Sequence, residues 1–145
     1  MKRTLFVLMA VTLVIISCSP KTQPQAGMKA DAPLDNTRWK MVRIAGMENF
    51  PRLEKDVFIQ FDKANNRFRG NAGCNNFNGG YTLEGSKLKL GPAAITKMFC
   101  AGDGMKVEDL FTKMMITIDG YEIKGDHMKL KIGSEVVAEF DALYL

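Results

Sequence analysis

The chain has 145 residues, 46% of them hydrophobic and 25% charged, so it is long enough for one ordinary domain with its own apolar core. Its 20 basic and 16 acidic residues give a formal charge of +4, which falls to +2 when Lys2 and Arg3 are removed. That excess is too small to indicate a nucleic-acid-binding protein.

The first eighteen residues predict a bacterial lipoprotein signal. Lys2 and Arg3 precede an apolar run over residues 5–16, which is too short for a spanning helix of about twenty residues. Residues 15–18, Ile-Ile-Ser-Cys, match the lipobox, in which a small residue precedes the cysteine that is lipidated. We expect residues 1–17 to be removed and Cys18 to carry acyl chains such as palmitate. An ordinary cleavable signal is the alternative.

Residues 18–33 are predicted to form a disordered tether, because they are rich in Pro, Gln, Lys, Ala and Gly and show no apolar period. The folded domain is expected over 34–145. A lipid anchor places this domain on a membrane of the cell envelope. In some bacteria an aspartate directly after the lipidated cysteine is associated with retention in the inner membrane. Ser19 occupies that position here, which favours a location in the outer membrane.

The first half of the domain shows strand patterns. A strand is expected over 39–44 and a loop over 49–55, and apolar residues then alternate with other residues over 57–62. A turn at 63–66 gives a hairpin whose facing pairs are Phe61 with Phe68 and Asp62 with Arg67.

Three further hairpins follow the same logic of matched faces and charges. A two-residue turn at 85–86 sets Tyr81, Leu83 and Glu84 against Leu90, Leu88 and Lys87. A two-residue turn at 125–126 sets Tyr121, Glu122 and Ile123 against Leu130, Lys129 and Met128. For the last hairpin we prefer a three-residue loop over 133–135, which aligns Ile132, Leu130 and Met128 with Val136, Ala138 and Phe140.

One segment has a helical period instead. Apolar residues recur from Val107 to Ile118 at a spacing that predicts an amphipathic helix of about three turns, with Asp103 as a possible N-cap. The fold class is therefore α+β and mainly antiparallel β. We expect a curled or barrel-like sheet of seven or eight strands with one helix, since a flat sheet with long free edges would be prone to aggregation.

The least generic stretch runs from Gly70 to Tyr81, where glycines and asparagines predict sharp turns of the backbone and Cys74 and Phe77 are expected to point inward. A second motif, Thr96-Lys-Met98-Phe-Cys100, follows. Together they resemble the META domain, the fold of HslJ-like heat-shock lipoproteins, over most of the mature chain. The residues that carry the resemblance are Gly73, Cys74, Asn75, Phe77, Gly79, Tyr81, Thr96, Met98 and Cys100. Lys97 stands where the family often has Arg.

The resemblance implies a β-rich envelope domain with no established catalytic activity. It also implies a link to heat shock, stress response and tolerance of novobiocin-type antibiotics. A weaker likeness in shape to lipid-binding pilot proteins raises a small-molecule or lipid carrier as an alternative.

Cys74 and Cys100 are the two thiols that remain after Cys18. In an exported chain an even pair favours a disulfide over a metal site. A redox-active pair and two buried free thiols are the alternative interpretations of these cysteines. A copper(I) stress sensor is a sharper alternative, because Met98, Met105, Met114 and Met115 add soft ligands, although methionine also fills apolar cores.

Catalysis is disfavoured by elimination. The mature chain has serines only at 19, 86 and 134, in the tether and in tight turns, and the single histidine, His127, is expected to be exposed beside a turn. No phosphate-binding loop or histidine-rich metal signature is present in the sequence. We therefore expect no enzyme activity, no cofactor and no bound metal.

Binding is the remaining class of function. The expected partners are the membrane, through the anchor, and an unidentified envelope protein or small ligand, with the chain itself monomeric. Lys87, Lys89, Lys129 and Lys131 lie at outward positions of two hairpins and are expected to be solvated, a placement that also discourages pairing between sheet edges.

Overall fold

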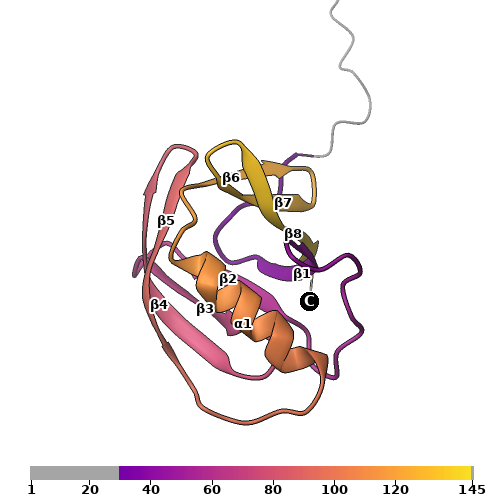
Figure 1. Ribbon diagram of the computed structural model, residues 1–145. Coiled ribbons are helices and arrows are strands. Elements are labelled where there is room, and N and C mark those ends of the chain that lie inside the picture. Colours follow the sequence, from indigo (N-terminus) through magenta and orange to yellow (C-terminus); the bar gives the residue numbers. More distant parts are fainter. Residues whose placement is uncertain (1–29, 145) are drawn as a thin grey trace, which may run out of the picture.

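The computed structural model describes residues 30–144 and shows one curled antiparallel sheet with a single helix packed in its concave side (Figure 1). The predicted signal peptide, Cys18 and most of the predicted tether lie outside the described residues. The elements are β1 (Arg38–Ile44), β2 (Phe58–Asp62), β3 (Arg67–Asn71), β4 (Asn76–Glu84), β5 (Lys87–Ile95), α1 (Asp103–Met115), β6 (Gly120–Lys124), β7 (His127–Ile132) and β8 (Glu135–Leu143).

The eight strands follow the order β5-β4-β3-β2-β1-β8-β7-β6, with every neighbouring pair antiparallel. This half-barrel confirms the predicted fold class. The two edge strands approach each other where the backbone N–H of Tyr121 donates to the carbonyl of Ser86, 3.0 Å away. The sheet therefore curls almost to closure without forming a continuous ladder between β5 and β6.

The predicted registers of the first three hairpins are confirmed. Phe61 faces Phe68, Leu83 faces Leu88, and Ile123 faces Met128. The strand β5 continues through Pro92 to Ile95, beyond the residue pairs predicted for this hairpin. Proline is tolerated there because β5 lies at the edge of the sheet and has a free side.

The three-residue loop expected between β7 and β8 is wrong. Ile132 pairs with Glu135 across a two-residue turn at Gly133 and Ser134, and a bulge after Val136 then restores the predicted pairs of Leu130 with Ala138 and Met128 with Phe140. Gly133 has a φ of 58°, and glycines 85 and 125 at the matching turn positions have φ of 60°. A glycine at positive φ in the first turn position suits a tight hairpin, so the turn stays short and the bulge absorbs the extra residue.

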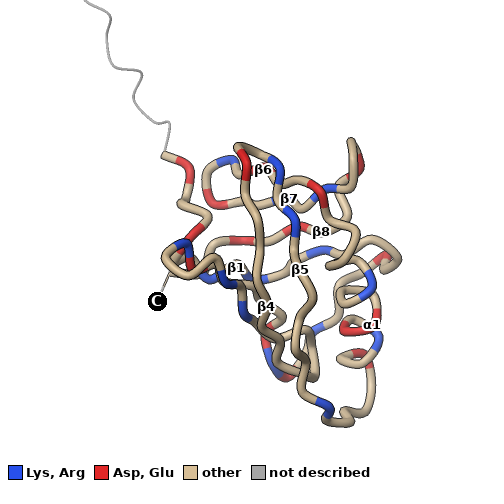
Figure 2. Tube along the Cα trace, turned by 90° about the vertical axis from the view of Figure 1, so that its left-hand side faces the viewer, with Lys and Arg blue, Asp and Glu red and all other residues tan. Residues whose placement is uncertain are grey.

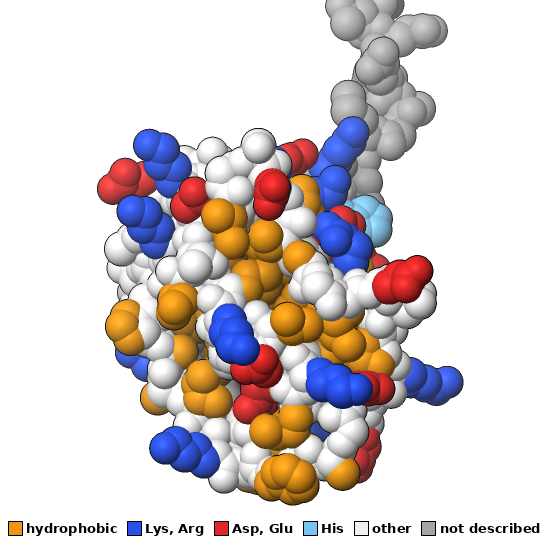
Figure 3. Space-filling model, in the orientation of Figure 1, with side chains coloured by type: hydrophobic (Ala, Val, Ile, Leu, Met, Phe, Trp, Pro, Cys, Tyr) orange, Lys and Arg blue, Asp and Glu red, His pale blue; other side chains and the backbone are white. Residues whose placement is uncertain are grey.

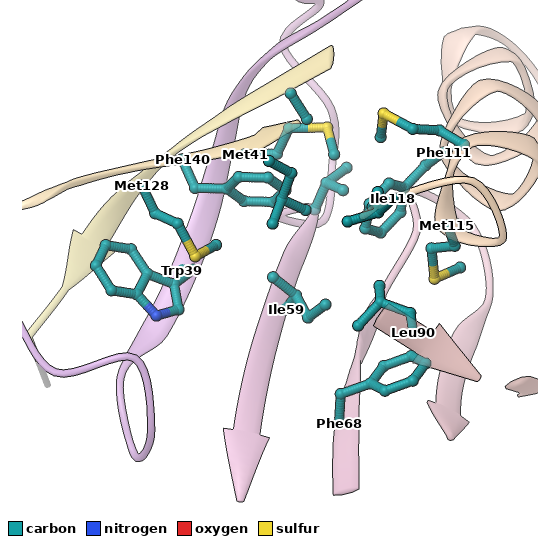
Figure 4. Packing of buried hydrophobic residues seen from close by; sticks show 14 of the residues in the cluster. Trp39, Met41, Ile59, Phe68, Leu90, Phe111, Met115, Ile118, Met128 and Phe140 are labelled. Atoms are coloured by element: carbon teal, nitrogen blue, oxygen red, sulfur yellow. The ribbon is translucent and has the colours of Figure 1, made fainter. Parts of the chain in front are cut away.

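The core lies between the concave face of the sheet and α1 (Figure 4). Trp39, Ile59 and Phe140 reach it from the strands, and Phe111 reaches it from the helix. Asp103, the predicted N-cap, is instead the first residue of the helix and pairs with Lys106. The N-cap position is occupied by Gly102, which has a φ of 84°. Ile118 is buried but lies beyond the end of the helix.

Candidate functional site

The Gly70–Tyr81 run forms a tight turn between two strands, although the turn is shorter than its composition suggested. The turn comprises residues 72–75, and residues 76–81 already belong to β4. Its backbone is closed by a hydrogen bond from the N–H of Ala72 to the carbonyl of Asn75, 2.9 Å away. Gly73 has a φ of 125°, and its N–H donates to Oδ1 of Asn71. A residue with a side chain would be strained at this φ.

Asn75 lies at the centre of the site, with only 2% of its surface exposed. Its side chain binds the segment after β5, residues 96–100, which we call the strap. Nδ2 of Asn75 donates to the carbonyl of Met98 at 3.0 Å, and Oδ1 accepts from the N–H of Met98 at 2.7 Å and from the Thr96 hydroxyl at 2.8 Å. One buried amide therefore fixes the strap backbone as a neighbouring strand would.

Glu108 connects this arrangement to the helix. Its carboxylate accepts from the backbone N–H of Asn75 at 2.6 Å and from Nδ2 of Asn75 at 2.9 Å. The helix also approaches the turn closely, because a Cβ on Gly73 would lie 2.6 Å from the carbonyl oxygen of Gly104. We call Asn75, Thr96, Met98 and Glu108 the Asn75 cluster. Glu108 is not among the residues that the sequence motifs single out. Its position within the apolar stripe, between Val107 and Phe111, was the signal that it faces inward.

Cys74 and Cys100 join the same segments covalently where oxidised. The structure places their sulfurs 2.03 Å apart and their Cα atoms 5.8 Å apart, which is disulfide geometry. Cys74 is fully buried, while Cys100 is partly exposed beside the helix N-terminus. The predicted pair thus stands at bonding distance and clamps the end of the strap to the turn that Asn75 organises.

The remaining motif residues belong to the core. The Phe77 ring packs between Phe68 and Phe111 at centroid distances of 5.9 and 5.5 Å. Tyr81 meets Phe61 edge to face at 5.2 Å, and burial raises the pKa of its phenol. Gly79 lies under the Phe68 ring, where an added Cβ would come within 2.6 Å of Cζ. These residues shape the apolar side of β4.

The strap itself faces solvent at its middle. Phe99 is 87% exposed and Met98 48% exposed, and Lys97 beside them is exposed as well. The loop between β5 and α1 lies at one end of the molecule in Figure 1, and apolar side chains gather at the same end in Figure 3. The described chain begins at the opposite end, where the N–H of Ala32 donates to the carbonyl of Gly125.

The soft ligands of the copper alternative are dispersed. Met114 and Met115 belong to the hydrophobic core, Met98 is half exposed, and the two sulfurs of the cysteines lie against each other. Within residues 30–144, no group of three or more His, Cys, Asp and Glu side chains is arranged to hold a metal ion. His127 is exposed, as predicted, and its Nδ1 lies 2.6 Å from Oδ1 of Asp141.

The polar atoms of the Asn75 cluster are engaged with one another. Every polar group of Asn75 takes part in the contacts described above: both lone-pair positions of Oδ1, both Nδ2 protons, the backbone N–H and the carbonyl. Such a network holds three segments of chain in a fixed arrangement. The Asn75 cluster therefore has a positioning role: it fixes the strap on the fold and leaves Met98 and Phe99 facing outward.

Comparisons with known proteins agree with this architecture. The model of the META domain family matches residues 32–142. The fold is similar to an NMR structure of a protein from Burkholderia xenovorans, with a TM-score of 0.62 and 20% identity over 85% of this chain and 99% of that one. A second NMR structure matches with a TM-score of 0.60 and 17% identity over 74% of this chain and 90% of that one. No curated protein matches the chain. No helix among the described residues is long and apolar enough to cross a membrane.

Proposed function

This chain belongs to the META domain family, and from that premise we propose that it is a non-catalytic, lipid-anchored protein of the cell envelope that acts by binding. Its binding element is the strap. The role is the one expected of HslJ-like proteins: supporting the envelope under heat or antibiotic stress of the novobiocin type, from the outer membrane.

The observation that carries this proposal is an aromatic side chain presented on a fixed backbone. Phe99 is 87% exposed, yet the strap around it is tied to the fold by Asn75 and by the Cys74–Cys100 pair. Exposed large apolar residues mark interaction sites when they occur together, as Met98 and Phe99 do. A segment that is already ordered loses little conformational entropy on binding, so a partner would gain more from the contact.

The carrier alternative finds less support in the arrangement of the core. Among residues 30–144, twelve large side chains are fully buried, and Trp39 and five phenylalanines, Phe111 of α1 included, are among them. Aromatic contacts run through the space between sheet and helix from Phe68 through Phe77 and Phe111 to Phe140. Side chains therefore occupy the volume in which a curled sheet would hold an apolar ligand.

The anchor is tested by replacing the lipobox cysteine. In cells fed a fatty-acid probe, the parent protein is expected to be labelled and to sediment with membranes, whereas Cys18→Ala is expected to lose both properties. Equal labelling of the two proteins would remove the anchor from the proposal.

The binding role is tested by complementation of a deletion strain challenged with heat or novobiocin. The parent gene and Ile116→Ser are expected to restore growth, and Phe99→Ser is expected not to, at equal protein levels. Ile116 is the matched control because it is 75% exposed at the other end of the helix. Full restoration by Phe99→Ser would show that the strap is not the binding element.

A further inference from the structure

The face of the sheet that points away from α1 carries a row of planar polar side chains. The row crosses four adjacent strands, since Arg38 faces Gln60, Gln60 faces Arg69, and Arg69 faces Asn78. Arg67 lies two residues before Arg69 and therefore points to the same side of β3. Figure 2 shows α1 on one side of the molecule and these strands with their basic residues on the other.

The three guanidinium groups are held in place but are not neutralised. Arg67 donates to Oδ1 of Asn78 at 2.7 Å, and Arg69 lies 3.4 Å from Oε1 of Gln60, so their contacts are neutral amides. Arg38 stacks on the Phe58 ring with Cζ 3.7 Å from the centroid, and its Nε is buried without a hydrogen-bond partner among the described residues. Each guanidinium has five N–H donors, so most of these donors remain available to a ligand.

The neighbouring carboxylates have partners of their own. Asp62 accepts from the N–H of Ala64 at 3.0 Å and from Nδ2 of Asn65 at 2.7 Å. The Asn65 hydrogen bond does most to hold the pKa of Asp62 below its ordinary value, while the charge of Arg69 contributes least. Asp56 pairs with Lys40, and Asp141 lies against His127. These acids therefore leave the arginines of β3 without a direct ion pair.

A cleft opens over this row. Its volume is about 250 Å³, and it is lined by Asn36, Gln60, Asp62, Arg67, Arg69 and Asn78, with Phe61 and Phe68 beneath. Pockets for drug-sized ligands usually measure about 300–1,000 Å³, so this one suits a single small ring. Amide and carboxylate side chains bind hydroxyl groups, and paired guanidinium N–H groups match the two oxygens of a carboxylate or phosphate.

We propose that this cleft binds an anionic saccharide, namely a sugar ring bearing a phosphate or carboxylate. Arg67 and Arg69 bind its oxyanion, and Gln60, Asn78 and Asp62 bind its hydroxyl groups. Arg38 extends the positive row toward β1 and attracts the next anionic group of a longer chain. This site lies on the opposite side of the sheet from α1 and does not depend on the strap, so it is a second binding function.

The test is a titration of the full mature lipoprotein in neutral detergent, followed by amide chemical shifts. Glucose 1-phosphate and glucuronate are the anionic probes, and glucose and inorganic phosphate are the controls. We expect saturable shifts confined to β2, β3 and β4 with at least one anionic sugar, at a concentration about tenfold below that needed for either control. Equal binding of glucose would overturn the anion recognition, and equal binding of phosphate would overturn the saccharide recognition.

A double variant assigns the site. Arg67→Gln with Arg69→Gln is expected to weaken binding of the anionic sugar roughly tenfold or more, since the loss of even one of the two charged hydrogen bonds costs about that much. Lys106→Gln with Lys113→Gln removes the same charge from the exposed face of α1 and is expected to leave binding unchanged. Retained amide spectra show that each variant is folded. Unchanged binding in the arginine variant, or shifts spread over every basic residue, would contradict the proposal.

The source of the sugar is distinguished with vesicles. Displacement of the soluble probe by vesicles that carry a phosphorylated glycolipid, and not by those with a neutral glycolipid, assigns the site to a membrane-borne saccharide. Binding of the soluble probe that neither vesicle displaces assigns it to a soluble one.

Discussion

At the scale of single residues, Asn75 has the greatest influence on the site because its side chain binds the strap backbone beyond the end of β5. The strap keeps one backbone hydrogen bond to β4, from the N–H of Thr96 to the carbonyl of Asn76, 3.0 Å away. Beyond it, the N–H and carbonyl of Met98 are both satisfied by the Asn75 side chain. Aspartate would lack the two Nδ2 donors and would bring a second carboxylate next to Glu108. The amide is thus chemically required at this position.

Asn75→Ala is expected to destabilise the fold by about 2–4 kcal/mol, because it leaves Met98, Thr96 and Glu108 with unsatisfied polar groups. The free energy of unfolding in urea is the measurement. Asn49→Ala, in an exposed loop, is the matched control and is expected to change stability by less than about 0.5 kcal/mol. Similar values for the two variants would mean that the buried amide does not stabilise the strap.

Gly79 and Gly80 offer a second test at this scale, because adjacent glycines in one strand have opposite surroundings. An added Cβ on Gly79 would lie 2.6 Å from Phe68 and 2.9 Å from the carbonyl oxygen of Pro92, whereas at Gly80 the nearest atom lies at 3.7 Å. Gly79→Ala is expected to cost about 1–3 kcal/mol by overpacking, and Gly80→Ala to be neutral or slightly stabilising. Thermal unfolding of the two variants would show this difference, and the reverse order would refute the packing argument.

At the scale of elements, the strap and α1 are positioned by the turn between β3 and β4. The close approach of Gly73 to Gly104 and the contacts of Asn75 with Glu108 bring the helix N-terminal half onto the turn. The Cys74–Cys100 pair then closes the loop that contains β4, β5 and the strap. A covalent link at this point restrains the unfolded chain as well as the strap.

The cysteine pair is expected to be oxidised in the exported protein. A thiol-alkylating reagent should then leave Cys74 and Cys100 unmodified until reductant is added, as peptide mass spectrometry would show. Reduction, or the double change Cys74→Ala with Cys100→Ala, is expected to lower stability by about 3 to 4 kcal/mol on the chain-entropy account of a loop of this length. Full alkylation without reductant would show that the thiols are free.

At the scale of the whole molecule, the sheet curls until its two edge strands, β5 and β6, approach each other but do not pair. The hydrogen bond from Tyr121 to Ser86 joins the edges, and an open cleft lined by Lys87, Lys89 and Lys131 lies beside it. Glu122 pairs with Lys131 and not with Lys129, which it faces in the register, and this contact lowers the pKa of Glu122. Lys87 and Lys89 are exposed on the edge strand β5, where they discourage pairing with another chain, whereas Lys129 and Lys131 lie partly buried on β7, inside the edge.

The seam between β5 and β6 is expected to be the part of the sheet that opens first. The amide of Tyr121 should exchange with deuterium at least tenfold faster than the amide of Gln60, because Gln60 lies in a strand with a partner on each side. Native-state hydrogen exchange by NMR is the measurement. Equal protection at the two amides would mean that the sheet is closed in solution.

The sequence by itself determined the class of fold and most strand pairs. Alternating apolar residues and charge-matched hairpins specify register locally, so Phe61 with Phe68 and Tyr121 with Leu130 could be predicted from neighbouring residues. The helix, the exposed His127 and the motif that carries the family resemblance were also readable. Each depends on short-range periodicity or on residue type.

Only the tertiary structure decided which groups the motif residues contact. The contacts of Asn75 with Glu108 span 33 residues and those with Met98 span 23, and no local pattern encodes such distances. The bulge in β8 likewise depended on a competition between a tight glycine turn and the core registers beyond it. The row of planar polar side chains formed only when four strands took their order in the sheet. Long-range pairing brings these groups together, and the sequence shows them only as separate polar residues.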